Sequence, residues 1–201
     1  MTVDIGVRVL HEALRKRGPR LIEPRPEFAQ ASVSLVLRPG VDGLEVLLIE
    51  RPVSDHDPWS GHMALPGGRK NPGETSLDAA IRETIEEVGI NLQVEGLELG
   101  RLDDIRPLRG GPAITVAPFV FAISESVIVQ ADPREVADTF WISLARLADP
   151  ACATDHLYLP PDGEGVRFPA LNYNGRVIWG LTYRMLTQLL EIVRSIRPDD
   201  A

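Results

Sequence analysis

A short helix over residues 76–88 has its ends and its rotation fixed by the sequence, and it constrains the fold more than any other segment. Thr75 or Ser76 is available as the N-cap, and Gly89 provides the left-handed residue that ends the helix. One face of this helix must pack against a core because it carries Leu77, Ile81, Thr84, Ile85 and Val88. The chain therefore needs a layer of other elements for this helix to cover.

Three glutamates lie on the opposite face of that helix, near its end. At about 100° per residue, Glu83, Glu86 and Glu87 fall within an arc of roughly 100°. Carboxylates at this end oppose the helix macrodipole by roughly 0.3–1 kcal/mol each, and like charges four residues apart repel each other. Screening by Arg82 and water is one explanation of the cluster, and a bound cation is another.

Strands are predicted on both sides of this helix along the chain. The segments ASVSLVL and LEVLLIE are rich in branched apolar residues, and RPGVDG between them predicts a hairpin. After the helix, strands are expected in LELGRLDD, AITVAPFVFAI and DTFWISL, where Pro118 favours an edge or a bulge in the second. A mixed α/β fold follows, with helices on the faces of a sheet of at least about five strands.

Further elements are predicted before the first strand and after the last one. Val7, Leu10 and Leu14 recur at helical spacing and predict an amphipathic helix that ends near Gly18. The polar, proline-bearing residues 148–169 are expected to run over the surface. A closing helix is then predicted, with one face formed by Leu181, Met185, Leu189, Ile192 and Ile196.

Charge and cysteine content exclude several classes of function. The formal net charge of −8 gives no broad attraction for nucleic acid or anionic membranes, so we expect a small-molecule partner. No apolar run is long enough for a signal peptide or a membrane-spanning helix. Cys152 is the single cysteine and is interpreted as structural, which suits a reducing compartment, and we expect the cytoplasm.

Residue types at fixed spacing extend the acidic helix into a longer motif. It runs Gly68, five residues, Glu74, seven residues, and then RETIEEVGI over residues 82–90. This pattern resembles the signature of the Nudix hydrolases, with Thr84 at a position that is usually aliphatic in that family. On composition alone, screening by Arg82 and water is the preferred explanation of the acids. Because so many residue types match at set separations, the resemblance favours a bound cation instead.

The resemblance implies a Nudix-type α/β/α sandwich with a central mixed sheet, and it extends more loosely over residues 33–190. We expect an N-terminal helix and linker over residues 1–30 and a single Nudix hydrolase domain over residues 31–197. The partner implied is a nucleotide substrate, with no nucleic acid and no membrane. The resemblance also allows a homodimer.

The acids of the motif are typical ligands of a hard divalent cation, magnesium or manganese. By resemblance, Glu83 and Glu87 bind the metal directly, Glu86 supports them or binds a further ion, and the Gly68 carbonyl completes the site. Glu74 and Arg82 tend to pair in the family and orient the helix. The reaction implied is hydrolysis of a nucleoside diphosphate linked to another group.

The general base that activates water varies within the family. Glu135 is the first candidate here and Glu125 the second, and both could equally be solvated surface acids. Activation of water by the metal itself is the alternative that needs no base.

The segment LLIERPVSDHDPWSGHMALPGG resembles an additional motif of the coenzyme A pyrophosphatase branch of the family. Its matching residues are Leu47, Leu48, Arg51, Gly61, Pro66, Gly67 and Gly68. It departs from that motif by one extra residue before Gly61 and by Ile49, His56 and Leu65, where His56 replaces a second arginine. The expected substrate contacts are Arg51, Gly61, Gly67, Gly68 and Arg69 or Lys70.

A C-terminal segment, LNYNGRVIWGLTYRML, also resembles that branch, although packing accounts for Trp179. The resemblance favours coenzyme A or acyl-CoA as substrate, with 3',5'-ADP and (acyl-)4'-phosphopantetheine as products. The alternative substrates are ADP-ribose, dinucleotides and oxidised nucleoside triphosphates, and the alternative from another class is a non-catalytic nucleotide-binding module. Two interpretations of Trp59, stacking on a base and packing in the core, stay open. The pair of His56 and His62 is not interpreted as a zinc site.

Overall fold

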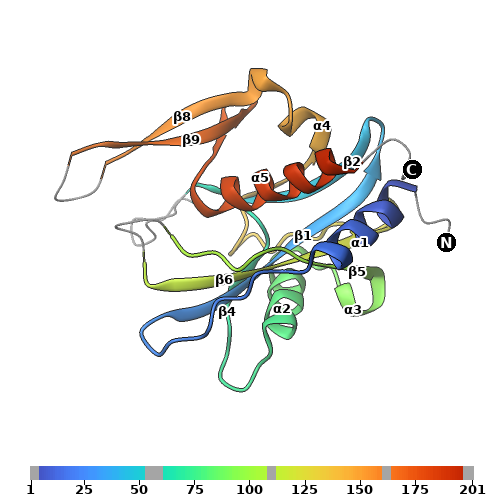
Figure 1. Cartoon of the computed structure of the whole chain (residues 1–201), viewed down its shortest axis with the longest axis horizontal. Helices are drawn as coiled ribbons and strands as arrows, with labels where there is room; N and C mark the ends of the chain where they lie inside the picture. Colours follow the sequence, from blue (N-terminus) through green and yellow to red (C-terminus); the bar gives the residue numbers. More distant parts are fainter. Residues whose placement is uncertain (1–4, 53–60, 108–111, 160–163, 197–201) are drawn as a thin grey trace.

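The computed structural model describes residues 5–52, 61–107, 112–159 and 164–196 (Figure 1). Its elements fall into two sheets and the helices that pack around them. In chain order they are α1 (Ile5–Arg17), β1 (Ala29–Gly40), β2 (Gly43–Glu50), β3 (Met63–Ala64), β4 (Gly67–Arg69), α2 (Ser76–Val88), α3 (Leu92–Glu95), β5 (Gly96–Arg101), β6 (Ile114–Ile123), β7 (Asp138–Ser143), α4 (Leu144–Leu147), the 3₁₀ turn η1 (Pro150–Cys152), β8 (Ala153–Tyr158), β9 (Val166–Tyr173), β10 (Arg176–Ile178) and α5 (Gly180–Ser195).

The larger sheet has seven strands and mixed strand directions. Its main path is β3-β2-β1-β6-β5, with β4 added beside β1 and β7 beside β2. The predicted hairpin is confirmed, since β1 and β2 are antiparallel and close with Gly40 opposite Gly43. Beside it β1 runs parallel to β6, from Ala29 opposite Ile114 onward. The predicted central mixed sheet is therefore present.

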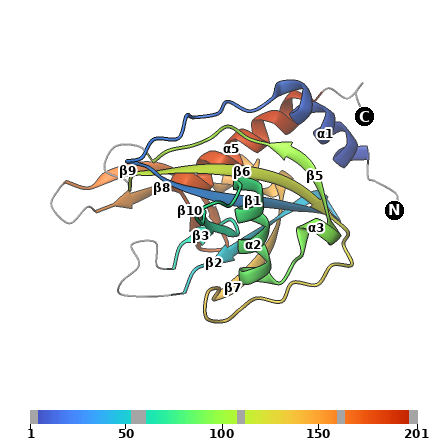
Figure 2. The ribbon, with the colours of Figure 1, turned by 90° about the horizontal axis from the view of Figure 1, so that it is seen from below.

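Helices cover both faces of this sheet (Figures 1 and 2). On one face α1 and α5 share a core to which Leu10, Leu14 and Leu189 contribute. On the other face α2 packs over a second core through Ile81 and Val88. The predicted α/β/α sandwich is confirmed. Among the described residues, the acidic helix α2 is longer than α3, its neighbour in the chain.

Helix α2 begins and ends as predicted, but its rotation differs from the prediction. Thr75 is the N-cap, and Gly89 at φ 72° ends the helix. The predicted burial of Ile85 is wrong because this side chain is 41% exposed. At about 100° per residue, the buried arc centres near Thr84, about 60° from Glu87 and about 100° from Ile85. The glutamate, not the isoleucine, therefore enters the packed side.

The edge position predicted from Pro118 is also wrong, because β6 lies between β1 and β5. A register shift does occur, but on the partner strand, between Glu98 and Gly100 of β5. The Pro118 carbonyl accepts from the Leu102 N–H, just past the end of β5. The N–H and C=O of one strand residue face the same side, so the position of the missing Pro118 N–H faces β5. The proline therefore removes no hydrogen bond between β6 and β1.

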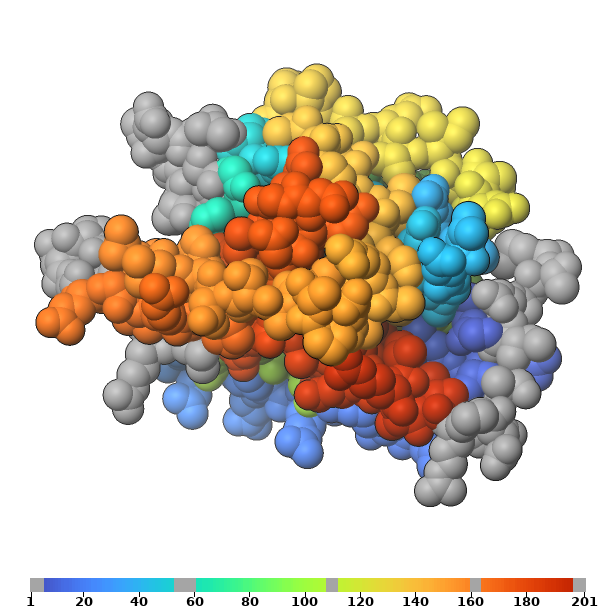
Figure 3. Space-filling view, turned by 90° about the horizontal axis from the view of Figure 1, so that it is seen from above, coloured from blue at the N-terminus to red at the C-terminus, as the bar shows by residue number. Residues whose placement is uncertain are grey.

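Residues 148–169 were expected to run over the surface, and the structure instead places regular elements there. After η1, strands β8 and β9 form an antiparallel hairpin, to which β10 is added (Figure 1). In the space-filling view the orange residues of this region extend to one end of the molecule (Figure 3). Pro169 is tolerated because only β8 pairs with β9 at that point, while β10 pairs further along, from Leu171 to Tyr173. Cys152 in η1 is buried in the main core.

One carboxylate fastens the two helices of the first face to the end of β5. Asp103 accepts from Arg17 Nη2 at 2.7 Å, from the Arg20 N–H at 2.8 Å and from Gln188 Nε2 at 2.8 Å. The Arg17 hydrogen bonds are the main reason that the pKa of Asp103 is lowered to about 2. This network therefore stabilises the folded state when Asp103 is ionised.

We expect Asp103→Asn to lower the free energy of unfolding at pH 7 by about 1–2 kcal/mol, because charge-assisted hydrogen bonds are lost. A lowered pKa gives stability that is present above the unfolded value near 3.8 and is lost as pH falls toward about 2. The gap between variant and wild type should therefore shrink between pH 4 and pH 2 in urea unfolding. A gap unchanged over that range, or an equal effect of Asp42→Asn at an exposed turn, would contradict this role.

Candidate active site

The last turn of α2 faces β4, and Glu87 is the most buried acid there. Its Oε2 accepts from the Gly67 N–H at 2.8 Å, and the side chain is 4% exposed. Burial is the main cause that raises the pKa of Glu87 to about 8, and the charges of Glu83 and Glu135 raise it further. The Gly67 hydrogen bond and the charge of Arg51 act in the opposite direction. A carboxylate enclosed in this way calls for a cation beside it.

Glu83 occupies the space that a side chain at residue 68 would fill. A Cβ built on Gly68 would meet the Glu83 carboxyl group, 2.6 Å from Oε1. Burial is the main cause that raises the pKa of Glu83, and the Arg82 hydrogen bond opposes it. Glu83 and Glu87, one helical turn apart, thus lie against Gly68 and Gly67 of one strand.

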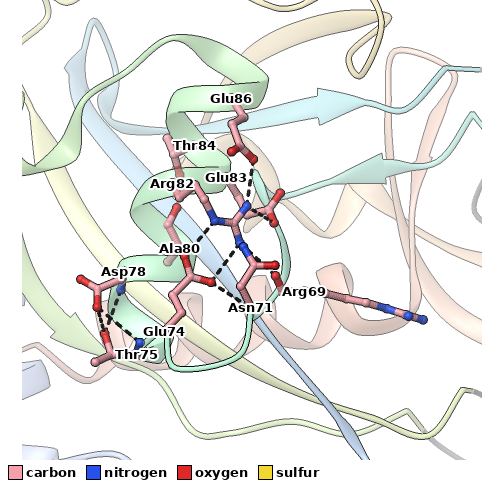
Figure 4. A network of polar contacts seen from close by, with 10 residues as sticks. All are labelled: Arg69, Asn71, Glu74, Thr75, Asp78, Ala80, Arg82, Glu83, Thr84 and Glu86. Carbon is pink, nitrogen blue, oxygen red and sulfur yellow. Dashed lines mark hydrogen bonds and ion pairs between the residues drawn. The ribbon is translucent and has the colours of Figure 1, made fainter.

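Arg82 is the centre of a polar network on the outer side of these acids (Figure 4). Its Nη1 donates to Glu83 Oε1 at 2.7 Å and to Glu86 Oε2 at 2.8 Å. Its Nε donates to Glu74 Oε1 at 2.8 Å, so the expected pairing of Glu74 with Arg82 is present. Arg82 therefore screens two of the three acids, while Glu87 has its hydrogen bond from Gly67.

The donors of the predicted metal site are of the right chemical type, but their oxygen atoms do not converge on one position. Among the residues with described positions, no three His, Cys, Asp or Glu side chains form a ready metal site. Arg82 holds Glu83 and Glu86, and the Gly67 N–H holds Glu87. Carboxylate and carbonyl oxygens are the donors that magnesium and manganese prefer. The donor set fits such a cation once Glu83 and Glu86 turn from Arg82 toward it.

A loop after β6 closes over the C-terminal end of α2. The N–H groups of Gln130 and Asp132 donate to the Val88 and Glu87 carbonyls at 2.9 and 3.0 Å. These bonds satisfy helix carbonyls that would otherwise lack partners. The same loop brings Glu135 close enough for its charge to raise the pKa of both Glu83 and Glu87. The geometry thus favours Glu135 over Glu125, which is exposed in the turn after β6.

The expected substrate-contact residues occupy the same side of the sheet with different orientations. Arg51 follows β2, its N–H donates to the His62 carbonyl at 3.1 Å, and its charge acts on Glu87. The Arg69 carbonyl accepts from Arg82, while its side chain extends away from the acids (Figure 4). Gly61 adopts φ 69° just before β3. His56 and Trp59 lie outside the described residues.

Sequence reasoning missed a group of aromatic side chains near this site. We name the aromatic cluster as His62, His156, Tyr158, Phe168 and Trp179. It joins residues more than a hundred positions apart in the chain, so no local pattern revealed it. The available signal was the alternation of His156 and Tyr158 with outward-facing neighbours, which is typical of a strand.

Thr84, the residue that departs from the Nudix signature, is accommodated by a partner on β1. Its hydroxyl lies 2.8 Å from the Ser34 hydroxyl and donates to the Ala80 carbonyl at 2.7 Å. Both hydroxyl-bearing side chains are fully buried. The threonine is therefore a hydrogen-bonded substitute for the usual aliphatic residue.

We expect Thr84→Val to lower the free energy of unfolding by about 1 kcal/mol, because the Ser34 hydroxyl loses one of its two partners. The matched control is Thr154→Val in exposed β8, which should change stability by less than about 0.5 kcal/mol. Thermal and urea unfolding of both variants provide the measurement. Equal stabilities for the two variants would show that the buried pair contributes nothing.

Comparison with known proteins agrees with this fold. The family model of the NUDIX domain matches residues 29–160. Nudix hydrolase 3 of Caenorhabditis elegans is 30% identical over 195 residues, which cover 88% of this chain and 78% of that protein. Nudix hydrolase NudL of Yersinia enterocolitica is 28% identical over 191 residues, covering 92% of this chain and 94% of that protein.

A Schizosaccharomyces pombe protein is 40% identical over 115 residues, but this stretch covers 35% of that relative, so the match spans about a third of its length. Two solved structures share the fold. A MutT/nudix family protein from Enterococcus faecalis has a TM-score of 0.55 at 19% identity, covering 86% of this chain and 65% of that one. A protein from Deinococcus radiodurans has a TM-score of 0.52 at 14% identity, covering 83% and 87%.

The match to the NUDIX domain, together with relatives that are Nudix hydrolases, places this α/β/α protein among the hydrolases. The chain belongs to the Nudix hydrolase family, which acts on pyrophosphate bonds. None of the helices described in this structure is both long enough and apolar enough to span a membrane.

Proposed function

We propose that this protein hydrolyses a nucleoside diphosphate linked to another group, with coenzyme A or acyl-CoA as substrate and magnesium or manganese as cofactor. The observation that carries the proposal is the convergence of Glu83 and Glu87 on Gly68 and Gly67. The Glu83 carboxyl group fills the space that a side chain at residue 68 would need, so glycine there lets carboxylate oxygens lie against the backbone, where a cation can bind them. Membership of the Nudix hydrolase family supports the same reaction.

In the proposed site Glu83, Glu87 and the Gly68 carbonyl hold the metal, and Glu86 supports them or binds a further ion. When bound, such a cation polarises the phosphoryl oxygen, lowers the pKa of water and neutralises the leaving phosphate. Glu74 holds Arg82, and Arg82 Nη1 donates to both Glu83 and Glu86, so its positive charge offsets their repulsion. This arrangement keeps like charges stable on one helix.

The remaining residues act on water and substrate. The Glu135 carboxylate accepts the proton of the attacking water as its oxygen bonds to phosphorus. A P–O bond of the diphosphate breaks, and its oxygen leaves with one of the two phosphates. Arg51 and Arg69 provide guanidinium groups that match phosphate oxygens, with Gly61 and Gly67 allowing the substrate to approach the backbone.

Coenzyme A is favoured by the partial match of the residues upstream of β3 and of the segment that contains Trp179. Its hydrolysis would yield 3',5'-ADP and 4'-phosphopantetheine, and acyl-CoA would yield the acylated product. We also propose that residues 1–30 precede a single catalytic domain over residues 31–197, and that the protein is compatible with a homodimer.

The test is a substrate panel with magnesium, with manganese and with a chelator. Coenzyme A, acetyl-CoA, ADP-ribose, NADH and oxidised dGTP are incubated with the protein, and the products are separated by chromatography. We expect metal-dependent release of 3',5'-ADP from coenzyme A. Turnover of ADP-ribose, NADH or oxidised dGTP without coenzyme A would overturn the substrate assignment, and no turnover of any compound would favour a nucleotide-binding module.

A further inference from the structure

The aromatic cluster gathers four rings around Trp179. His156 stacks on Trp179 with centroids 4.1 Å apart and ring planes inclined by 28°. Tyr158 and Phe168 lie 5.6 and 5.8 Å from Trp179, inclined by 31° and 42°. His62 meets Trp179 edge-on at 5.2 Å. The cluster therefore presents one ring stacked on Trp179, two rings tilted against it and one edge-on.

One face of the β8–β9 hairpin supplies most of this cluster. His156 lies opposite Phe168 in the strand pairing, and Tyr158 follows two residues later on the same face. Leu157 points to the other face and is 46% exposed. All five cluster rings stay partly exposed, whereas the core ring of Phe121 is 2% exposed. Packing alone would enclose these rings more fully, and their open surface is available to a ligand.

The aromatic cluster lies beside the acids of α2. His62 is joined to Arg51 through its backbone carbonyl, and the Arg51 charge reaches Glu87. Gly67 follows His62 by five positions in the sequence, a span of at most about 17 Å. Arg176 of β10 donates to Glu50 Oε2 at 2.9 Å, which fixes the segment before Trp179 against the end of β2. A nucleotide that spans base and diphosphate can reach both places.

We propose that the aromatic cluster, centred on Trp179, stacks the nucleobase of the substrate while the acids of α2 face its diphosphate. This inference rests on the proposed function for the class of substrate, and it adds the residues that recognise the base. The stacked pair of His156 and Trp179 offers flat ring surface that suits a planar heteroaromatic group, and base–aromatic stacking tolerates different bases. The edge of His156 carries nitrogen atoms that can hydrogen-bond to the base.

His156 is suited to stacking as a neutral ring. Burial lowers the pKa of His156, so the imidazole carries little charge near pH 7. A neutral imidazole also keeps one donor and one acceptor nitrogen. Nucleobases present donors and acceptors on their edges, so this state complements them.

The experiment measures binding of ADP, which contains a base, and of 4'-phosphopantetheine, which contains none, by calorimetry with magnesium. The variants are Trp179→Leu, Trp179→Phe and the matched control Trp141→Leu, whose ring instead lies against Arg38. We expect Trp179→Leu to weaken ADP binding by about 5- to 150-fold and to leave 4'-phosphopantetheine unchanged. Trp179→Phe should restore most of the affinity, and Trp141→Leu should bind ADP like wild type.

Equal ADP affinity of wild type and Trp179→Leu would overturn the inference even if coenzyme A is hydrolysed. A loss confined to 4'-phosphopantetheine would overturn it as well, because the cluster would then hold the pantetheine arm. Trp179-dependent ADP binding without coenzyme A hydrolysis would support the cluster and reject the proposed substrate. If Trp179→Leu does not fold, His156→Ala on the exposed hairpin replaces it, with the same expected loss of ADP affinity.

Discussion

Glu87→Gln is expected to lower the rate of hydrolysis by at least about 100-fold, because the amide keeps the shape of the side chain but cannot supply a charged oxygen to a cation. Folding should not suffer. The pKa of Glu87 is raised to about 8, so its contribution to stability is present below about 4.5 and is lost as pH rises through 8. A neutral glutamine avoids this cost, and we expect the metal-free variant to gain about 1–3 kcal/mol at pH 8.

Steady-state kinetics and urea unfolding of the same preparations give the two measurements. Glu98→Gln, an exposed residue of β5, is the matched control and should leave both quantities unchanged. Full activity of Glu87→Gln would show that this carboxylate does not hold the metal. A strong loss of stability would instead assign it to the packing of α2 against β4.

Alanine at Gly67 and alanine at Gly68 are expected to fail in different ways. Gly67 has φ +152°, and a Cβ there would come 2.6 Å from the Val33 Cα, so backbone must move. We expect Gly67→Ala to lower the free energy of unfolding by about 3 kcal/mol or more. At Gly68 the added Cβ meets the mobile end of a side chain, Glu83, so Gly68→Ala should fold with a loss below about 1 kcal/mol.

The activity of Gly68→Ala carries the functional part of this prediction. A displaced Glu83 carboxylate no longer lies beside the proposed metal position, and we expect a loss of about 10- to 100-fold in hydrolysis. Gly73→Ala is the control for Gly67→Ala, because it also replaces a glycine at positive φ but in a place where no atom lies within 4 Å of the new Cβ. Full activity of Gly68→Ala would show that the position of the Glu83 carboxylate does not matter for hydrolysis.

Local signals were sufficient for the helix that carries the acids. Thr75, Gly89 and the apolar periodicity between them act within a few residues of each other, so the bounds of α2 agreed with the prediction. The same holds for the turn between β1 and β2. Sequence also supplied the pairing of Glu74 with Arg82, because the motif fixes their separation.

The features that the sequence did not predict depend on tertiary contacts. Glu87 is buried because β4 offers the Gly67 N–H from another part of the sheet, which helix periodicity alone does not include. Pro169 argued against a strand, and only the staggered pairing of β8 and β10 with β9 makes it acceptable. The ring of Trp179 gains its neighbours from the residue before β3 and from β8 and β9, so its environment depends on the whole topology.

The acidic helix α2 packs against the larger sheet and the aromatic hairpin belongs to the smaller one, and among the described strands no ladder joins the two sheets. Substitutions on the β8–β9 hairpin therefore leave the hydrogen-bonded frame around α2 intact. Evolution can vary the length and side chains of this hairpin at little risk to folding. A directed library confined to the inward positions of β8 and β9 should accordingly yield a high proportion of soluble variants with altered substrate preference.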